Sequence, residues 1–233
     1  MLVFLLALAL VLSGLSLGRW QLSRAEQKLT AQAAVEAQAS KPALDNAQLL
    51  ADTPVSHLYR SAVLRGQWIP GQTVLLDNRP MEGRVGFYVL TPFLLEGSKS
   101  SVMVQRGWIP RNFENRADVP QVASPTGVVV LVGRITPPPG ALYDLGTQPE
   151  GQIRQNVDLK QFASAAGIDL LTEISVQQTD AVSGGLLQHW PVVNVGVDKH
   201  YGYAFQWFAL AALIAGLYAW FQIIRPRISR PKD

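Results

Sequence analysis

The sequence HYGYAFQWFALAALIAGLYAWFQII, at residues 200–224, is the strongest indication of architecture in this chain. Its last 24 residues carry no charge, and Arg225 ends the run. A helix needs about 20 predominantly apolar residues to cross a hydrocarbon core of about 30 Å. Residues 200–224 are therefore predicted to form a transmembrane helix, with the basic residues after it among the lipid headgroups.

A second uncharged run, MLVFLLALALVLSGLSL, occupies residues 1–17. It lacks a basic n-region and exceeds the roughly 7 to 15 residues usual for the apolar part of a signal peptide, which favours an uncleaved anchor. A cleaved signal, or a true start further upstream, stays open. We predict a first transmembrane helix at 1–22, a helical stalk and linker at 23–54, a domain at 55–199, a second transmembrane helix at 200–224 and a basic tail at 225–233.

The charges are distributed unevenly along the chain. Of the 20 Lys and Arg residues, seven flank the two apolar runs: Arg19, Arg24, Lys28, Arg225, Arg227, Arg230 and Lys232. Residues 29–199 hold the other 13 basic residues and 15 of the 17 acidic ones. This balance argues against nucleic acid as a partner and assigns the basic clusters to the lipid bilayer.

The basic tail favours a cytoplasmic C-terminus, so that with two spans the domain faces outward. Arg19, Arg24 and Lys28 argue the other way, although long domains translocate largely regardless of charge. The absence of cysteine excludes disulfides, thiolate metal sites and cysteine nucleophiles.

Short runs separated by Gly, Pro and Asn predict strands at 59–68, 73–77, 86–94, 101–109, 128–135 and 171–177, with one helix at 159–166. In the fourth strand, the period of two places Val102, Val104, Arg106 and Trp108 on one face. Two similar stretches, RGQWIP at 65–70 and RGWIP at 106–110, predict strand ends with buried indoles. The expected fold is a membrane protein with two transmembrane α-helices flanking a mostly antiparallel β (α+β) extracytoplasmic domain.

Catalytic motifs are missing from the sequence. It contains no His-Glu-x-x-His, Gly-x-Ser-x-Gly, Walker A or dinucleotide-binding pattern. We therefore expect a protein that is not an enzyme.

The second span has two distinct faces. At about 100° per residue, one side carries His200, Tyr203, Trp207, Ala211, Ile214 and Tyr218, and a separate stripe carries Ala209, Ala212, Gly216 and Ala219. Small residues allow helices to approach closely, so the stripe is predicted to pack on Gly14 and Gly18 of the first span.

The face headed by His200 suits a flat apolar ligand that needs one nitrogen donor. Haem is such a ligand, because an imidazole takes an axial position on its iron. Arg19, Trp20 and Arg24 are expected near the same interface, where the arginines are candidates for pairing with carboxylate groups of such a ligand. Two alternatives stay open: an interfacial aromatic belt, and a histidine packed against a partner protein.

Several fragments together resemble the surfeit locus protein 1 family. They are GRWQLSR at 18–24, DNRP at 77–80 with Gly83, GFYVLTP at 86–92, VQRGWIP at 104–110 and HYGYAFQWF at 200–208. The resemblance implies an assembly factor for cytochrome c oxidase in the bacterial inner membrane, multi-pass, with its central domain in the periplasm. It also implies that His200 is the axial ligand of a transiently bound haem a, which the protein supplies to oxidase subunit I, with haem a synthase as a further candidate partner.

Two other hypotheses remain. A scaffold that holds a nascent oxidase subunit without haem would use the Arg/Trp strand ends and the small-residue stripe. A two-span sensor or envelope hydrolase would need a pocket or a catalytic dyad in the domain. His57 and His189 are candidate second axial ligands, with a surface or hydrogen-bonded structural role as the alternative.

Overall fold

The computed structural model describes residues 1–111, 122–142, 151–180, 185–190 and 196–228. The chain divides into two compact units. One contains Met1–Ala34 and Val193–Asp233, and the other contains Val35–Val192. Residues 229–233 of the predicted basic tail lie outside the described residues.

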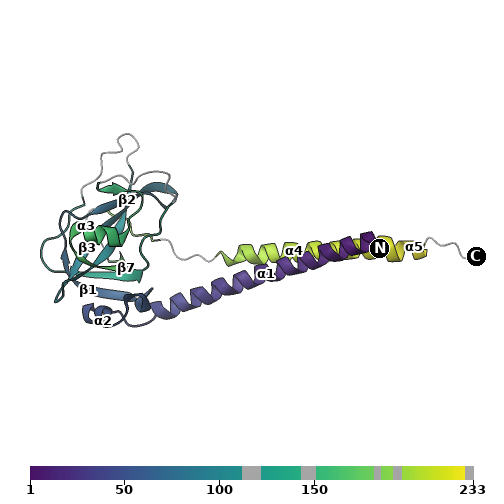
Figure 1. Ribbon diagram of the computed structural model, residues 1–233, viewed down its shortest axis with the longest axis horizontal. Helices are drawn as coiled ribbons and strands as arrows, with labels where there is room; N and C mark the ends of the chain where they lie inside the picture. Colours follow the sequence, from purple (N-terminus) through teal and green to yellow (C-terminus); the bar gives the residue numbers. More distant parts are fainter. Residues whose placement is uncertain (112–121, 143–150, 181–184, 191–195, 229–233) are drawn as a thin grey trace, which may run out of the picture. The chain divides into compact units, whose positions relative to one another are not determined.

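The second unit is built around a sheet that closes on itself. Its strands run in the order β1-β5-β7-β4-β3, and β1 also pairs with β3, which completes a barrel. These strands are β1 (Ser61–Trp68), β3 (Arg84–Leu95), β4 (Ser100–Pro110), β5 (Val129–Thr136) and β7 (Asp169–Gln178). The first half of β3 extends beyond the barrel and pairs with β2 (Val74–Met81), which in turn pairs with β6 (Ile153–Arg154). Figure 1 shows these strands packed together with α3 (Leu159–Ala166).

The predicted strands and the helix at 159–166 are confirmed, and most strand pairs are antiparallel. Two pairs are parallel, β4 with β7 and β2 with β6. Local punctuation explains the element ends: Asp158 caps α3 and Gly167 ends it in the left-handed conformation at φ 65°. Glu82 and Gly83 join β2 to β3 with φ of 50° and 75°, as a tight hairpin turn requires.

The barrel interior is the larger of the apolar cores. It contains Leu64, Trp68, Phe93, Val102, Val104, Leu131, Ile135, Ile174 and Val176, all buried. A second core lies where Leu159 and Phe162 of α3 pack on Leu76, Leu90 and Met103. The alternation of β1, in which Ala62, Leu64, Gly66 and Trp68 are buried and the residues between them are less so, is what one inward face predicts.

The predicted common face of the fourth strand is wrong at one residue. Val102 and Val104 lie in the barrel core, and the Arg106 guanidinium lies over the ring of Trp68 in that core, whereas Trp108 packs in a different cluster. Leu90 pairs with Gln105 but Val89 pairs with Gly107, so Arg106 has no partner across the ladder. One extra residue of this kind is a β-bulge, and it turns every following side chain to the other face.

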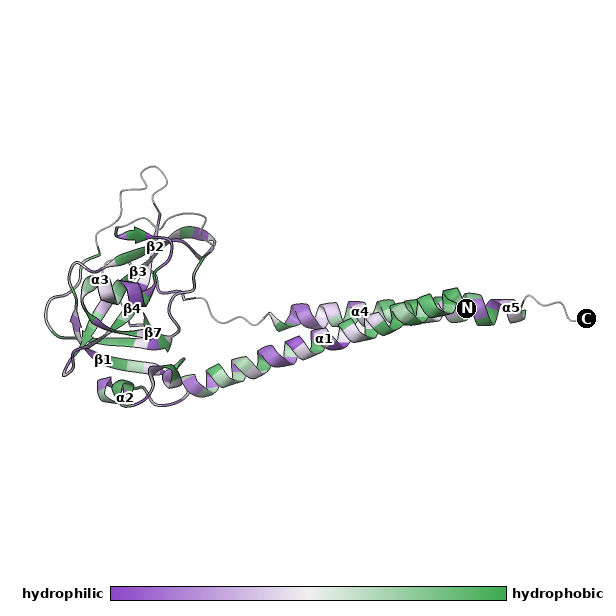
Figure 2. Cartoon of the chain, viewed as in Figure 1, coloured by the Kyte–Doolittle hydropathy of each residue, from purple (hydrophilic) through white to green (hydrophobic). Residues whose placement is uncertain are grey.

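The first unit contains the two long apolar helices. They are α1 (Leu2–Ala39), of which residues 2–34 belong to this unit, and α4 (Val197–Ala219). Helix α4 continues through a π-helical turn, η2 (Trp220–Ile224), into α5 (Arg225–Ile228). Both are long and apolar enough to cross a membrane. Figure 2 shows the continuous hydrophobic stretches on each. The predicted fold class, two such helices flanking a β-rich domain, is confirmed.

Two short helices precede the barrel in the domain. They are α2 (Asn46–Ala51) and the 3-10 turn η1 (Pro54–His57). Asp45 and Gln48 form a capping box at the start of α2, which satisfies backbone donors that the first turn leaves free.

Candidate functional site

A regular stripe of α1 is shielded from solvent, and its Gly14, Gly18 and Gln21 lie against α4. The less exposed residues of α1 recur at alternating spacings of four and three: Ala7, Val11, Gly14, Gly18, Gln21, Ala25, Lys28 and Gln32. This spacing is typical of two helices packed along a shared seam. The seam is lined mainly by small residues, and Ala25 is fully buried in it.

Gly14 and Gly18 set the register of the two helices. A Cβ on Gly14 would lie 3.1 Å from Cβ of Ala211, and one on Gly18 would lie 2.5 Å from the ring of Phe208. The two glycines thus accommodate a backbone approach and an aromatic ring that a larger residue would exclude. The rings of Phe4 and Tyr218 meet at 5.8 Å near the other end of the seam.

The predicted facing of α4 is wrong. Ala209, Ala212 and Gly216 of the small-residue stripe are exposed, whereas His200 and Ala211 of the other face contact α1. Tyr203 of that face is 52% exposed. Rotating α4 to bury the stripe would separate His200 from a polar partner on α1, and an unpaired polar group is costly in an apolar setting.

That partner is Gln21. Nδ1 of His200 lies 2.7 Å from Oε1 of Gln21, and the pair is partly buried. The two residues are 179 positions apart in the chain. Sequence reasoning missed Gln21, and the only available signal was its place at seam spacing from Gly14, Gly18 and Ala25.

The hydrogen bond determines which nitrogen of His200 is free. An amide oxygen accepts hydrogen bonds and cannot donate them, so Nδ1 carries the proton and donates. In the neutral ring Nε2 then holds the lone pair. Within the part of the chain that the structure describes, Nε2 has no hydrogen-bond partner.

The packed helices α1 and α4 form a helical hairpin, and four further side chains lie on one flank of it, beside the Gln21–His200 pair. Trp20 and Arg24 are four residues apart on α1, as are Tyr203 and Trp207 on α4, so each pair shares one side of its helix. The register set by Gly14 and Gly18 places these turns beside each other, and helix handedness puts both pairs on the same side of the seam. Tyr203 and Trp20 are about half exposed.

Arg19 is not brought to that flank. It is exposed, and it stands about 140° around α1 from Arg24, because the two are five residues apart on the helix. Arg24 donates from Nη1 to Oε1 of Gln27 at 3.1 Å on the exposed surface. Of the two arginines predicted for carboxylate groups, Arg24 is therefore the better placed.

His57 and His189 belong to the domain and not to the hairpin. His57 is buried, with Nε2 3.8 Å from Asp52. His189 is exposed and its Nδ1 lies 2.6 Å from Oε1 of Glu82. The hairpin itself therefore offers one imidazole, that of His200.

Of the Arg and Trp residues in the two repeated strand ends, Trp68, Arg106 and Trp108 are buried, whereas Arg65 is exposed and pairs with Glu96. Arg106 is 1% exposed and lies 4.4 Å from the centre of the Trp68 ring, so the second repeat packs directly on the first. Its guanidinium donates to Oγ of Ser124 and to the carbonyl of Ala123, and burial lowers its pKa. The expectation of buried indoles is confirmed for Trp68 and Trp108.

Arg79, within the DNRP segment, also has a structural role. It donates to the carbonyls of Gly140 and Gln155, and its own carbonyl accepts from Nε1 of Trp108 at 2.8 Å. Burial lowers the pKa of Arg79, partly offset by Tyr88, whose own pKa burial raises. Nearby, Gly86 admits the Trp108 ring, which a Cβ would approach within 2.5 Å.

Residues 8–212 match the sequence model of the SURF1 family. The chain belongs to this family. The matched range begins inside α1 and ends inside α4, so the SURF1 region includes the barrel and both partners of the Gln21–His200 pair.

Named SURF1 relatives match over most of the chain. The SURF1-like protein of Rickettsia bellii is 27% identical over 212 residues, covering 87% of this chain and 83% of its own. That of Rickettsia conorii is 27% identical over 214 residues, 88% of this chain and 84% of its own. The cytochrome oxidase assembly protein SHY1 of Saccharomyces cerevisiae is 24% identical over 157 residues, 65% of this chain and 40% of the yeast protein.

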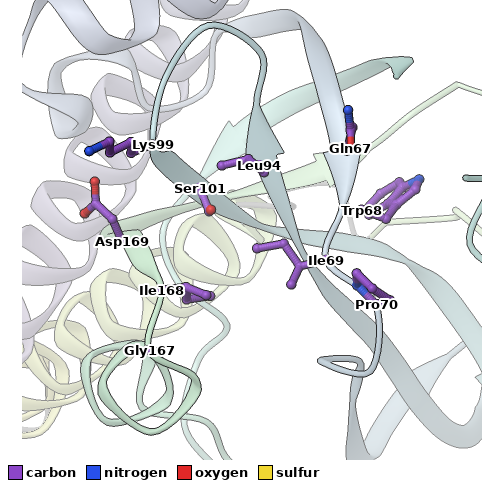
Figure 3. Close-up of a pocket in the computed structure, with 10 residues that line it drawn as sticks. All are labelled: Gln67, Trp68, Ile69, Pro70, Leu94, Lys99, Ser101, Gly167, Ile168 and Asp169. Atoms are coloured by element: carbon purple, nitrogen blue, oxygen red, sulfur yellow. The ribbon is translucent and has the colours of Figure 1, made fainter. Parts of the chain in front are cut away.

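The SURF1 domain contains a cavity of about 520 Å³, shown in Figure 3. It lies between the end of β1, with Trp68 and Pro70, and the turn from α3 into β7. Oγ of Ser101 in its wall is buried and has no hydrogen-bond partner among the residues that the structure describes, and Asp169 accepts from Ser100 at 2.8 Å. None of the residues predicted for ligand binding lines it, and no imidazole stands beside Ser101 to act as a base.

Proposed function

We propose that this SURF1 protein is an assembly factor for cytochrome oxidase that binds haem a transiently through Nε2 of His200 and supplies it to oxidase subunit I. The observation that carries the proposal is the 2.7 Å hydrogen bond from His200 to Gln21, which leaves Nε2 with a lone pair. Family membership and the name of the yeast relative support the assembly role.

The donor set fits a haem. Haem brings an iron that accepts an axial imidazole and a porphyrin edge with two carboxylates. On this chain His200 would take the iron, the rings of Trp20, Tyr203 and Trp207 would contact the macrocycle, and Arg24 would pair with a carboxylate. A single axial imidazole exchanges more easily than two, which suits a protein that must release its cargo.

Haem binding is tested by purifying the full chain from cells that make haem a. We expect a Soret band in the native protein and loss of most bound haem in the His200→Ala variant. The matched control is His189→Ala, which removes a surface histidine and should retain native haem occupancy. Equal haem content in the native and His200→Ala proteins would exclude His200 as the ligand.

The proposal also specifies where the protein is located in the cell. The protein would lie in a bacterial inner membrane with its domain in the periplasm, where it would meet subunit I and receive cargo from haem a synthase. Basic residues concentrated after the second span support this orientation.

The orientation is testable because the chain has no cysteine. We expect Gln161→Cys, on the exposed side of α3, to react with a membrane-impermeant maleimide in spheroplasts. Asp233→Cys in the tail should react only after the membrane is opened. The reverse pattern would place the domain in the cytoplasm.

The exposed stripe of Ala209, Ala212 and Gly216 favours a second candidate, a scaffold that packs on a helix of subunit I without haem. Burial removes Arg106, Trp68 and Trp108 from its contact surface, and Arg65 remains exposed. Crosslinking that captures subunit I equally with and without haem supply, in a protein with no Soret band, would support the scaffold over the carrier.

A further inference from the structure

We infer that Gln21 is a positioning residue for the haem ligand: its amide oxygen holds His200 in the Nδ1–H form and keeps Nε2 available to iron. The ligand half of this inference rests on the proposed function. The tautomer half concerns the free protein and stands on the geometry alone.

Gln21 is well placed to hold the ring of His200. Gln21 is partly buried between Gly18 and Ala25, whose small side chains let the glutamine reach across to α4. The contact with Nδ1 of His200 is short, at 2.7 Å. Breaking it would leave two polar groups unpaired in an apolar seam, so the pair is expected to persist.

A histidine without such a partner is a poorer ligand. Neutral imidazole exists in two tautomers, and only the one protonated at Nδ1 has a lone pair at Nε2. Metal-binding histidines usually donate their other N–H to an acceptor that fixes the ring, and losing that acceptor typically costs about 10- to 100-fold in affinity.

The chemical nature of the acceptor matters as well. A carboxylate in place of Gln21 would draw the Nδ1 proton more strongly and make Nε2 a stronger donor to iron. A neutral amide orients the ring without this strengthening. The choice of glutamine is consistent with a carrier that holds its haem loosely enough to release it.

The first experiment uses the free, full-length protein in micelles, with ¹⁵N-labelled histidine. His200 is assigned by the signal missing from His200→Ala. We expect the native His200 to be protonated at Nδ1, and Gln21→Leu to give a mixture of tautomers. Gln206→Leu, an exposed glutamine on the same helix as His200, is the control and should leave the tautomer unchanged. An unchanged tautomer in Gln21→Leu would overturn the inference.

The second experiment adds ferric haem a to the same proteins. Gln21→Leu should weaken binding by about 10- to 100-fold, and Gln206→Leu should leave it unchanged. Gln21→Glu should raise the iron–histidine stretching frequency of the ferrous form in resonance Raman spectra and slow release to apomyoglobin. Unchanged affinity in Gln21→Leu, with an unshifted stretching frequency in Gln21→Glu, would also overturn the inference.

The two proposals fail in different ways. Haem retained by His200→Ala would defeat the proposed function, and the tautomer measurement would still test the role of Gln21. Haem lost from His200→Ala but retained by Gln21→Leu with a native tautomer would defeat the role of Gln21 alone.

Discussion

The barrel and the helical hairpin place side chains of opposite size in their interiors. In the barrel domain the largest residues are inside: Trp108 is fully buried, as are Phe87 and Phe93. In the hairpin the buried residues are Gly14, Gly18, Ala25, Ala204 and Ala211. Many of the large side chains are exposed, and Phe205 is 74% exposed.

The difference follows from the surrounding medium. In water, burying a large apolar side chain removes the most surface from solvent, so aromatic residues stabilise the domain core. In lipid the surroundings are as apolar as the side chains, and helices associate by close packing and interhelical hydrogen bonds instead. The outward aromatics and the inward glycines of the hairpin are therefore the expected arrangement for a protein that spans a bilayer.

The two regions also satisfy buried polar groups differently. The domain buries Arg79 and Arg106 and pairs each guanidinium with backbone carbonyls. The hairpin seam holds the Gln21–His200 pair, in which Nε2 of His200 has no hydrogen-bond partner among the described residues. Nε of both arginines is also buried with no hydrogen-bond partner among the described residues, so depth of burial, and not complete pairing, separates them from the partly buried His200.

The largest expected effect is on the domain. Trp108→Ala should destabilise the barrel by about 3–5 kcal/mol, because it removes a fully buried indole and its hydrogen bond to the Arg79 carbonyl. Hydrogen exchange of the β3 and β4 amides, measured on the full chain in micelles, reports this free energy. A change below about 1 kcal/mol would show that the domain does not depend on its aromatic core.

An intermediate effect is expected at the helix seam. Gly18→Ala should weaken the packing of α1 on α4 by about 1–3 kcal/mol, since its Cβ would meet the Phe208 ring. Gly216→Ala is the matched control, because a Cβ there would meet no atom of the described residues within 4 Å and the helix propensity gained is the same. Titration with SDS, followed by energy transfer between dyes on the two helices, measures the difference. Equal stability of the two variants would contradict the packing of α1 on α4 through Gly18.

The smallest effect is expected at an exposed aromatic residue of the hairpin, because such a residue should not contribute to the stability of the helix pair. Phe205→Ala removes an aromatic ring, as Trp108→Ala does, but from an exposed position facing away from the seam. The hairpin should lose less than about 0.5 kcal/mol in the same SDS titration. A loss as large as that of Gly18→Ala would mean that the outward aromatics stabilise the hairpin.

Much of the fold could be predicted from local sequence. The helix at residues 159–166 matches α3 at both ends, because Asp158 and Gly167 mark its boundaries. The strand positions followed from the alternation and the turn residues. The apolar runs predicted the two long helices, and His200 stood out as a lone imidazole at the edge of one of them.

The predictions were wrong where the structure depends on how segments far apart in the sequence pack together. The bulge at Arg106 depends on the register against β3, and it moved Trp108 to the other face. The facing of α4 was predicted from its small residues alone, without the polar pair that competes with them. The sequence therefore predicted one residue of the candidate site, His200, from its position at the start of the second span, but it did not predict Gln21.

By itself the sequence determined the composition of each part: two apolar spans, a punctuated β region between them, and a histidine where the second span begins. These depend on residues that are neighbours in the chain, so short windows contain the information. Only the tertiary structure decided which helix faces meet, where the barrel closes and which nitrogen of His200 stays free. Those outcomes depend on contacts between residues far apart in sequence, whose competing arrangements differ by a small net free energy that no local pattern reveals.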